Sequence, residues 1–191
     1  MIAARRQRAR AVAAVLLMAA ATCVLALTLA QLQQRLQRAP ISQARYEEVR
    51  ESPWLSAPVT TRGTLHVTRQ ALEKRVTWPR PETWRLLEDR AEWAGPDGAG
   101  RKQILYSQAP ALQVLADVTR LAITADLAGL ERDFDITVQG DEGVWSAELK
   151  PRTPRVSRLV ASVELQGAGA RLLVLIVTER QGERTTTRIL P

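Results

Sequence analysis

Cysteine and histidine are almost absent from this chain of 191 residues, which contains one of each. Cys23 lies inside the first hydrophobic run, so a domain that follows this run has neither a disulfide nor thiol chemistry. His66 lies on the polar side of an alternating segment, where a surface histidine is expected rather than a catalytic base. Because the sequence also lacks metal-ligand spacings and a phosphate-binding glycine loop, we expect no metal and no cofactor.

Paired carboxylates are the remaining route to catalysis, and neither pair in this sequence favours it. Asp133 and Asp135 share the outer face of an expected strand, and Asp141 and Glu142 lie in an expected turn. We interpret both pairs as solvated surface charge, and no serine or cysteine nucleophile pattern accompanies them. The sequence therefore predicts a protein that is not an enzyme.

Acidic residues are missing from the start of the chain. None precedes Glu47, whereas Arg5, Arg6, Arg8 and Arg10 lie within the first ten residues. Without these four arginines the formal net charge of +7 falls to +3, which is the net charge of the chain after residue 30. Its basic residues are interspersed with Glu and Asp and form no cationic run or nucleic-acid motif. We expect no nucleic-acid partner.

Residues 11–30 contain no charge and follow the arginine-rich start, a pattern typical of a secretory signal. Small residues at Thr28 and Ala30 suit cleavage before Gln31, and residues 24–26 offer a second cleavage site. The segment 1–30 is therefore predicted to direct export.

The same run is about long enough to span a bilayer, so an uncleaved N-terminal membrane anchor is the alternative to a signal peptide for residues 1–30. Lipid attachment at Cys23 is a third possibility, although residues 20–22 match its recognition sequence poorly. In every case the arginine-rich end stays in the cytoplasm and the rest is exported. Residues 31–41 are polar and helix-prone, and we interpret them as a short helical or linker segment.

Alternation of apolar and polar residues dominates the rest of the chain and predicts half-buried β-strands. It runs through residues 63–69, 134–139, 145–149 and 159–166, whereas residues 172–177 are apolar on both faces and residues 185–190 are β-branched. Short turns with glycine at 140–143, 167–169 and 181–183 join the last strands, which is typical of an antiparallel meander.

One segment, residues 110–130, follows a helical period instead, with apolar residues three and four positions apart. Asp126 and Gly129 predict a break and then a short second helix. A sheet with one apolar face needs a cover, and these helices would supply it while enclosing an apolar cavity. The predicted fold class is mainly β (α+β), an antiparallel sheet covered by one or two inserted helices.

Several short motifs follow one another in order along residues 42–190. They are Tyr46-x-Glu48-x-Arg50, Pro58 with the strand 63–67, residues 72–75 with Pro79, Asp126-x3-Leu130-x3-Phe134 with Ala125 in place of a glycine, and Trp145-x3-Leu149-Lys150-Pro151. This series resembles the outer-membrane lipoprotein carrier (LolA-type) family, and more closely a divergent LolA-related branch. The resemblance implies an open antiparallel half-barrel with an apolar interior that takes acyl chains, so residues 42–191 are expected to be a LolA-like lipid-carrier domain.

The resemblance also implies a latch and a set of partners. Arg69 stands at the position of an arginine that holds the helical lid closed in the family, but Gln70 replaces the usual proline and Arg75 the usual tryptophan. The family function is that of a periplasmic carrier, which receives acylated lipoprotein or lipid cargo from an inner-membrane donor and passes it to an outer-membrane acceptor. The two departures leave a glycolipid or polyene-type lipid open as the cargo.

The side chains expected to contact an acyl chain face the interior or its rim. They are Leu65, Val67, Arg69, Trp78, Trp84, Leu115, Val118, Leu121, Phe134, Ile136, Trp145 and Leu149. Trp145 is also readable as core packing, and Trp78 and Trp84 as either rim aromatics or plain packing. The alternative function is a non-catalytic, membrane-anchored scaffold or docking subunit of an envelope lipid-synthesis or export system, in which side chains fill the cavity.

Overall fold

The computed structural model describes residues 27–68, 70–98 and 100–190. Their elements, in chain order, are α1 (Leu29–Arg38), β1 (Gln43–Glu51), β2 (Val59–Val67), β3 (Leu72–Trp78), β4 (Glu82–Leu86), β5 (Arg90–Ala94), the 3-10 turn η1 (Pro96–Gly98), β6 (Lys102–Leu105), α2 (Pro110–Ile123), α3 (Leu127–Glu131), β7 (Phe134–Gly140), β8 (Val144–Pro151), α4 (Pro154–Ser157), β9 (Val160–Ala168), β10 (Arg171–Glu179) and β11 (Arg184–Leu190).

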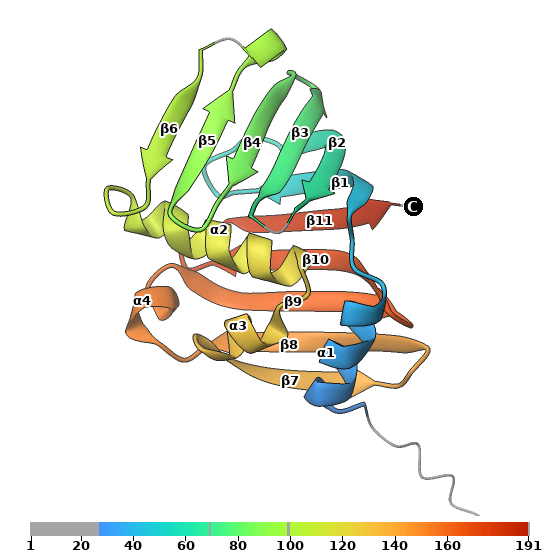
Figure 1. The fold of residues 1–191 in the computed structure, drawn as a ribbon. Coiled ribbons are helices and arrows are strands. Elements are labelled where there is room, and N and C mark those ends of the chain that lie inside the picture. The colour runs from blue at the N-terminus through green and yellow to red at the C-terminus, as the bar shows by residue number, and fades with distance from the viewer. Residues whose placement is uncertain (1–26, 69, 99, 191) are drawn as a thin grey trace, which may run out of the picture.

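All eleven strands form one open antiparallel sheet in the order β6-β5-β4-β3-β2-β1-β11-β10-β9-β8-β7. Two meanders, β1–β6 and β7–β11, are joined where the first strand pairs with the last, with Tyr46 opposite Ile189. The sheet bends so that β2–β6 rise above β7–β11, and α1, α2 and α3 lie on its inner face in that bend (Figure 1). The predicted fold class, an open antiparallel sheet covered by inserted helices, is confirmed.

The inner face of β7–β10 forms the main core. Alternate residues of β8 and β9, including Trp145, Leu149 and Val163, are buried together with side chains of all three covering helices. The Trp145 indole N–H donates to the carbonyl oxygen of Gly169 at 3.0 Å. A side chain at Gly167 would place its Cβ 2.1 Å from the Trp145 ring, so only glycine admits the indole there.

Helix α1 is part of this core rather than a separate arm. Leu32 and Leu36 are buried at the i, i+4 spacing that the sequence displays. The amide of Gln33 donates to the Ala125 carbonyl oxygen at 3.0 Å and accepts from the Leu127 backbone N–H at 2.8 Å. Helix α1 therefore fixes the junction between α2 and α3.

The junction between α2 and α3 contains Ala125, which stands in place of a glycine in the sequence motif Asp126-x3-Leu130-x3-Phe134. Ala125 has a left-handed backbone (φ 57°), the conformation that glycine adopts without a steric cost. The break expected around Asp126 is observed, because the Asp126 carboxylate accepts from the Gly129 backbone N–H at 2.8 Å and begins α3.

Among the described residues, no helix is both long enough and apolar enough to span a bilayer. The export segment proposed for residues 1–30 lies mostly outside the described residues, which begin at Leu27.

Candidate functional site

A cleft of about 270 Å³ lies between α2 and the inner face of the β1–β4 and β11 region. Helix α2 contributes Leu112, Leu115, Ala116, Thr119 and Ile123, and the sheet contributes Glu48, Leu65, Leu72, Lys74, Trp84, Leu86, Thr185 and Thr187. The helix side repeats every three or four residues, so one face of α2 forms one wall. The cleft is thus mainly apolar, with a polar group in its opposite wall.

Helix α2 has a second apolar face. Val118 and Leu121 are buried in the main core against β7–β10 and α3, while Leu115 and Thr119 face the cleft. Near its N-terminus, Leu112 and Ala116 pack against Ala91 of β5, which closes one end of the cleft. The helix is therefore anchored on its core side and at one end, and its other side borders open space.

The polar group centres on an ion pair between strands β1 and β3. The Lys74 ammonium lies 2.6 Å from the Glu48 carboxylate, and the Thr187 hydroxyl of β11 donates to the second Glu48 oxygen at 2.9 Å. The side chains of Lys74 and Glu48 are only 22% and 18% exposed. Lys74 also lies 5.0 Å above the ring of Tyr46, a cation–π distance. The charged groups are therefore held in place by three strands.

Tyr46 forms the floor beneath this ion pair. It is buried. Burial raises the pKa of the Tyr46 phenol, and the nearby Glu48 carboxylate adds to the rise, so the phenol stays neutral at physiological pH.

Two indoles lie beyond Lys74 on the neighbouring strands β4 and β5. The Glu82 carboxylate accepts from the indole N–H groups of Trp84 at 3.0 Å and Trp93 at 2.9 Å. Lys102 lies 5.6 Å from the centre of the Trp93 ring. One carboxylate therefore holds both rings in place on neighbouring strands, with the Trp84 ring against the cleft.

A family model described as outer membrane lipoprotein carrier protein LolA-like matches residues 19–190. The chain belongs to this LolA-like family. Similar solved structures include the LolA superfamily protein NE2245 from Nitrosomonas europaea, with 12% identity over 86% of this chain and 92% of that one and a TM-score of 0.43. A putative outer membrane lipoprotein-sorting protein domain from Vibrio parahaemolyticus has 11% identity over 86% and 89% of the two chains, with a TM-score of 0.41. A DUF1329 family protein from Desulfovibrio piger has 10% identity over 83% and 88%, with a TM-score of 0.38. No curated protein matches the chain.

The residues expected to contact an acyl chain fall into separate groups in this LolA-like chain. Leu65, Trp84 and Leu115 come together in the cleft, where Leu65 is also part of the main core and Leu115 packs against it. Val118, Leu121, Phe134, Trp145 and Leu149 are buried in the main core, and Ile136 packs against it. These six residues do not line the cleft.

The remaining three expected residues lie elsewhere. Val67 borders a hollow of about 630 Å³ between the β2–β3 turn and the C-terminal end of α2. Trp78 is 50% exposed, with the Arg62 guanidinium 5.5 Å from its ring centre. Arg69, the expected latch, lies outside the described residues.

Sequence reasoning missed the polar residues of the cleft. Lys74 follows Leu72 by two positions and therefore shares its face, so strand alternation was a usable signal. Glu48 was noted only as part of a motif, and no local signal joins it to Thr187, which is 139 positions away.

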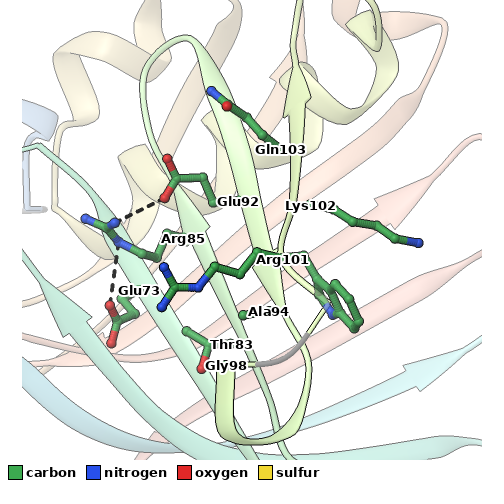
Figure 2. A pocket seen from close by; sticks show the side chains of 10 residues that line it. Glu73, Thr83, Arg85, Glu92, Ala94, Gly98, Arg101, Lys102 and Gln103 are labelled. Carbon is green, nitrogen blue, oxygen red and sulfur yellow. Dashed lines mark hydrogen bonds and ion pairs between the residues drawn. The ribbon is translucent and has the colours of Figure 1, made fainter.

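A second depression, of about 580 Å³, lies on the opposite face of β3–β5 and beside η1. Arg85 bridges two carboxylates there, with its Nε 3.6 Å from Glu73 and its Nη1 3.1 Å from Glu92, and Arg101 projects over the same region (Figure 2). This polar, charged lining is unsuited to an acyl chain. Within the part of the chain that the structure describes, no group of three or more His, Cys, Asp or Glu residues is placed to hold a metal ion.

Proposed function

We propose that this LolA-like protein is a carrier that shelters an acyl chain of a lipid or lipoprotein in the cleft between α2 and the sheet. The observation that carries the proposal is a mainly apolar cleft beside an otherwise packed core, bordered by one face of α2. Each methylene transferred from water into such a space contributes about 0.8 kcal/mol, so a chain needs no directed hydrogen bonds to be held.

The sequence supports a setting for this carrier. Its arginine-rich, apolar N-terminal segment would direct the chain across the inner membrane and either be cleaved or remain as an anchor. The carrier would then work in the periplasm, receiving its cargo from an inner-membrane donor and passing it to an outer-membrane acceptor. Its role is binding and transfer, without catalysis.

The test is to purify the exported protein from a Gram-negative host and identify co-purified lipid by mass spectrometry. After delipidation, uptake of an acyl probe is compared between the parent protein, Leu115→Trp and the control Leu173→Trp. The indole at 115 fills the cleft, whereas Leu173 lies on β10 away from the cleft and is 36% exposed. We expect uptake to fall at least about tenfold in Leu115→Trp only, the loss of roughly two methylene contacts. A parent protein that neither carries lipid nor takes up the probe contradicts the proposal.

A docking subunit of an envelope lipid-synthesis or export system is the second candidate. The observation that favours it is Trp54, which is 79% exposed in the β1–β2 loop beside the exposed Leu55. Large apolar side chains on a surface are typical of contact sites. In that case Trp54→Ser, and not Leu115→Trp, would abolish function in the cell while lipid uptake by the purified protein stays unchanged.

A further inference from the structure

The Glu48–Lys74 ion pair is unusual because it faces a space otherwise suited to methylene groups. Both side chains line the cleft and both are less than one quarter exposed. Withdrawing charges from water is costly, and apolar residues of similar volume would commonly make a wall as stable or more stable. The pair therefore needs an explanation other than the stability of the wall.

The arrangement leaves hydrogen-bonding capacity on two side chains that line the cleft. Lys74 has three donor hydrogens, of which one meets Glu48, and the ring of Tyr46 covers one side of the ammonium. The two Glu48 oxygens accept from Lys74 and Thr187 and retain further lone pairs. Donor and acceptor atoms thus lie 2.6 Å apart in the same wall.

Charge decides which cargo groups suit this wall. A carboxylate or phosphate would be attracted by Lys74 but repelled by Glu48 at nearly the same distance, and a quaternary ammonium group would meet the reverse. A bare methylene chain would cover both charges and remove their remaining contact with water. A hydroxyl group is neutral and is both donor and acceptor at one atom. Its oxygen is able to accept from Lys74 while its hydrogen is donated to Glu48.

We propose that the cleft selects acyl lipids that carry a hydroxyl group near the chain, recognised by the Lys74 ammonium and the Glu48 carboxylate together. The inference rests on the proposed carrier function and specifies its cargo. The hydroxyl belongs either to the acyl chain itself, as in a hydroxy-fatty acyl group, or to a glycerol or sugar head group. The recognition chemistry is the same for both sources.

The experiment measures competition against the neutral fluorescent probe N-phenyl-1-naphthylamine with three uncharged ligands of equal chain length. Methyl 3-hydroxytetradecanoate carries one hydroxyl on the chain, 1-tetradecanoylglycerol carries two on the head group, and methyl tetradecanoate carries none. In the full-length protein we expect at least one hydroxylated ligand to bind about tenfold more tightly than the methyl ester, the factor that one net hydrogen bond supplies. Which ligand is preferred identifies the source of the hydroxyl.

The variant Glu48→Gln/Lys74→Met removes the ion pair. It is expected to bind the hydroxylated ligand and methyl tetradecanoate with about equal affinity. The matched control Glu148→Gln/Lys150→Met makes the same changes at an exposed pair on β8, 3.4 Å apart, and should keep the preference. If the double variant does not fold, Glu48→Gln alone, which keeps the size of the side chain, is expected to reduce the ratio at least threefold because a charged partner is lost.

The outcomes separate the inference from the carrier function. Equal affinity for all three ligands in the parent protein, or a preference that survives in the ion-pair variants, overturns the hydroxyl selection and leaves the carrier function standing. A parent protein that binds none of the three ligands overturns the carrier function and the selection with it.

Discussion

The first residues of the described chain predict where a processed protein begins. Leu27 is 5% exposed and belongs to the main core, and Thr28 caps α1. The Thr28 hydroxyl accepts from the Gln31 backbone N–H at 3.3 Å, and the Gln31 side chain accepts from the Thr28 backbone N–H at 2.9 Å. Cleavage before Gln31 would remove both features, whereas cleavage after residue 26 would keep them.

The test therefore compares the free energy of unfolding of two purified chains, one that begins at Leu27 and one that begins at Gln31. Burial of a leucine side chain contributes about 2 kcal/mol and a threonine cap about 1 kcal/mol, so the shorter chain, which also loses the partly buried Leu29, should be at least about 3 kcal/mol less stable. Its new amino group would also place a positive charge in the first turn of α1, which is unfavourable beside the helix dipole.

Urea unfolding and thermal unfolding measure this difference. For a domain of this size, about 3 kcal/mol corresponds to a shift in the melting temperature of roughly 6–12 °C. Leu27→Ala and Thr28→Ala in the longer chain apportion the loss between burial and capping. Intact-mass analysis of the exported protein should find an N-terminus at or before Leu27. Equal stability of the two chains, or a mature protein that begins at Gln31, would refute the reasoning.

Two further predictions concern stability alone. Gly63→Ala should destabilise the protein by more than about 2 kcal/mol, because the new Cβ would lie 1.8 Å from the Arg75 carbonyl oxygen; unchanged urea unfolding would refute this. Asp133→Asn should cost about 1 kcal/mol at pH 7. Although burial opposes it, the hydrogen bonds from Thr153 and Arg155 hold the pKa of Asp133 below its ordinary value. The stability that the carboxylate contributes is therefore present above its unfolded pKa, about 3.9, and is lost as the pH falls through the lower folded value. The gap between the two proteins should thus narrow as the pH falls below the unfolded pKa of about 3.9, and a gap independent of pH would argue against this account.

Strands β7, β8 and β9 could be predicted from the sequence because each of them has one wet face. The alternating segments 134–139, 145–149 and 159–166 became β7, β8 and β9, with the turns where glycine indicated them. Their inward residues alternate through Trp145, Ala147 and Leu149, all buried. In a sheet that is covered on one face, burial alternates along each strand, and apolar and polar residues therefore alternate in the sequence.

The strands β4, β5 and β6 were not predicted, and the physical reason is their short length and mixed inner face. Each has only four or five residues, and their inward positions hold Glu82, Trp84 and Trp93 rather than a row of aliphatic residues. The carboxylate is acceptable on that face because two indole N–H groups donate to it. Pairing of β4 with β5 brings these donors to the carboxylate, and a local sequence pattern does not reveal that pairing.

Helix α2 was predicted from the sequence, but which of its faces borders the cleft was not. Its helical period was clear, but both of its faces are apolar, and the sequence did not distinguish Leu115, which borders the cleft, from Val118 and Leu121, which are buried in the core. Which face meets packed side chains depends on how far β1–β4 bend away from the helix. That distance is a property of the whole sheet, and no local periodicity encodes it.

Core packing and the proposed cargo binding thus involve different faces of helix α2. The face with Val118 and Leu121 joins α2 to the core formed by β7–β10, so large changes there should unfold the protein. The face with Leu115 and Thr119 meets the cleft, where a change of volume alters the space for cargo more than the packing of the core. The ion pair in the opposite wall is held by β1, β3 and β11. In such an arrangement the cargo preference is free to change through a few residues on two facing walls while the sheet and its anchoring helix stay the same.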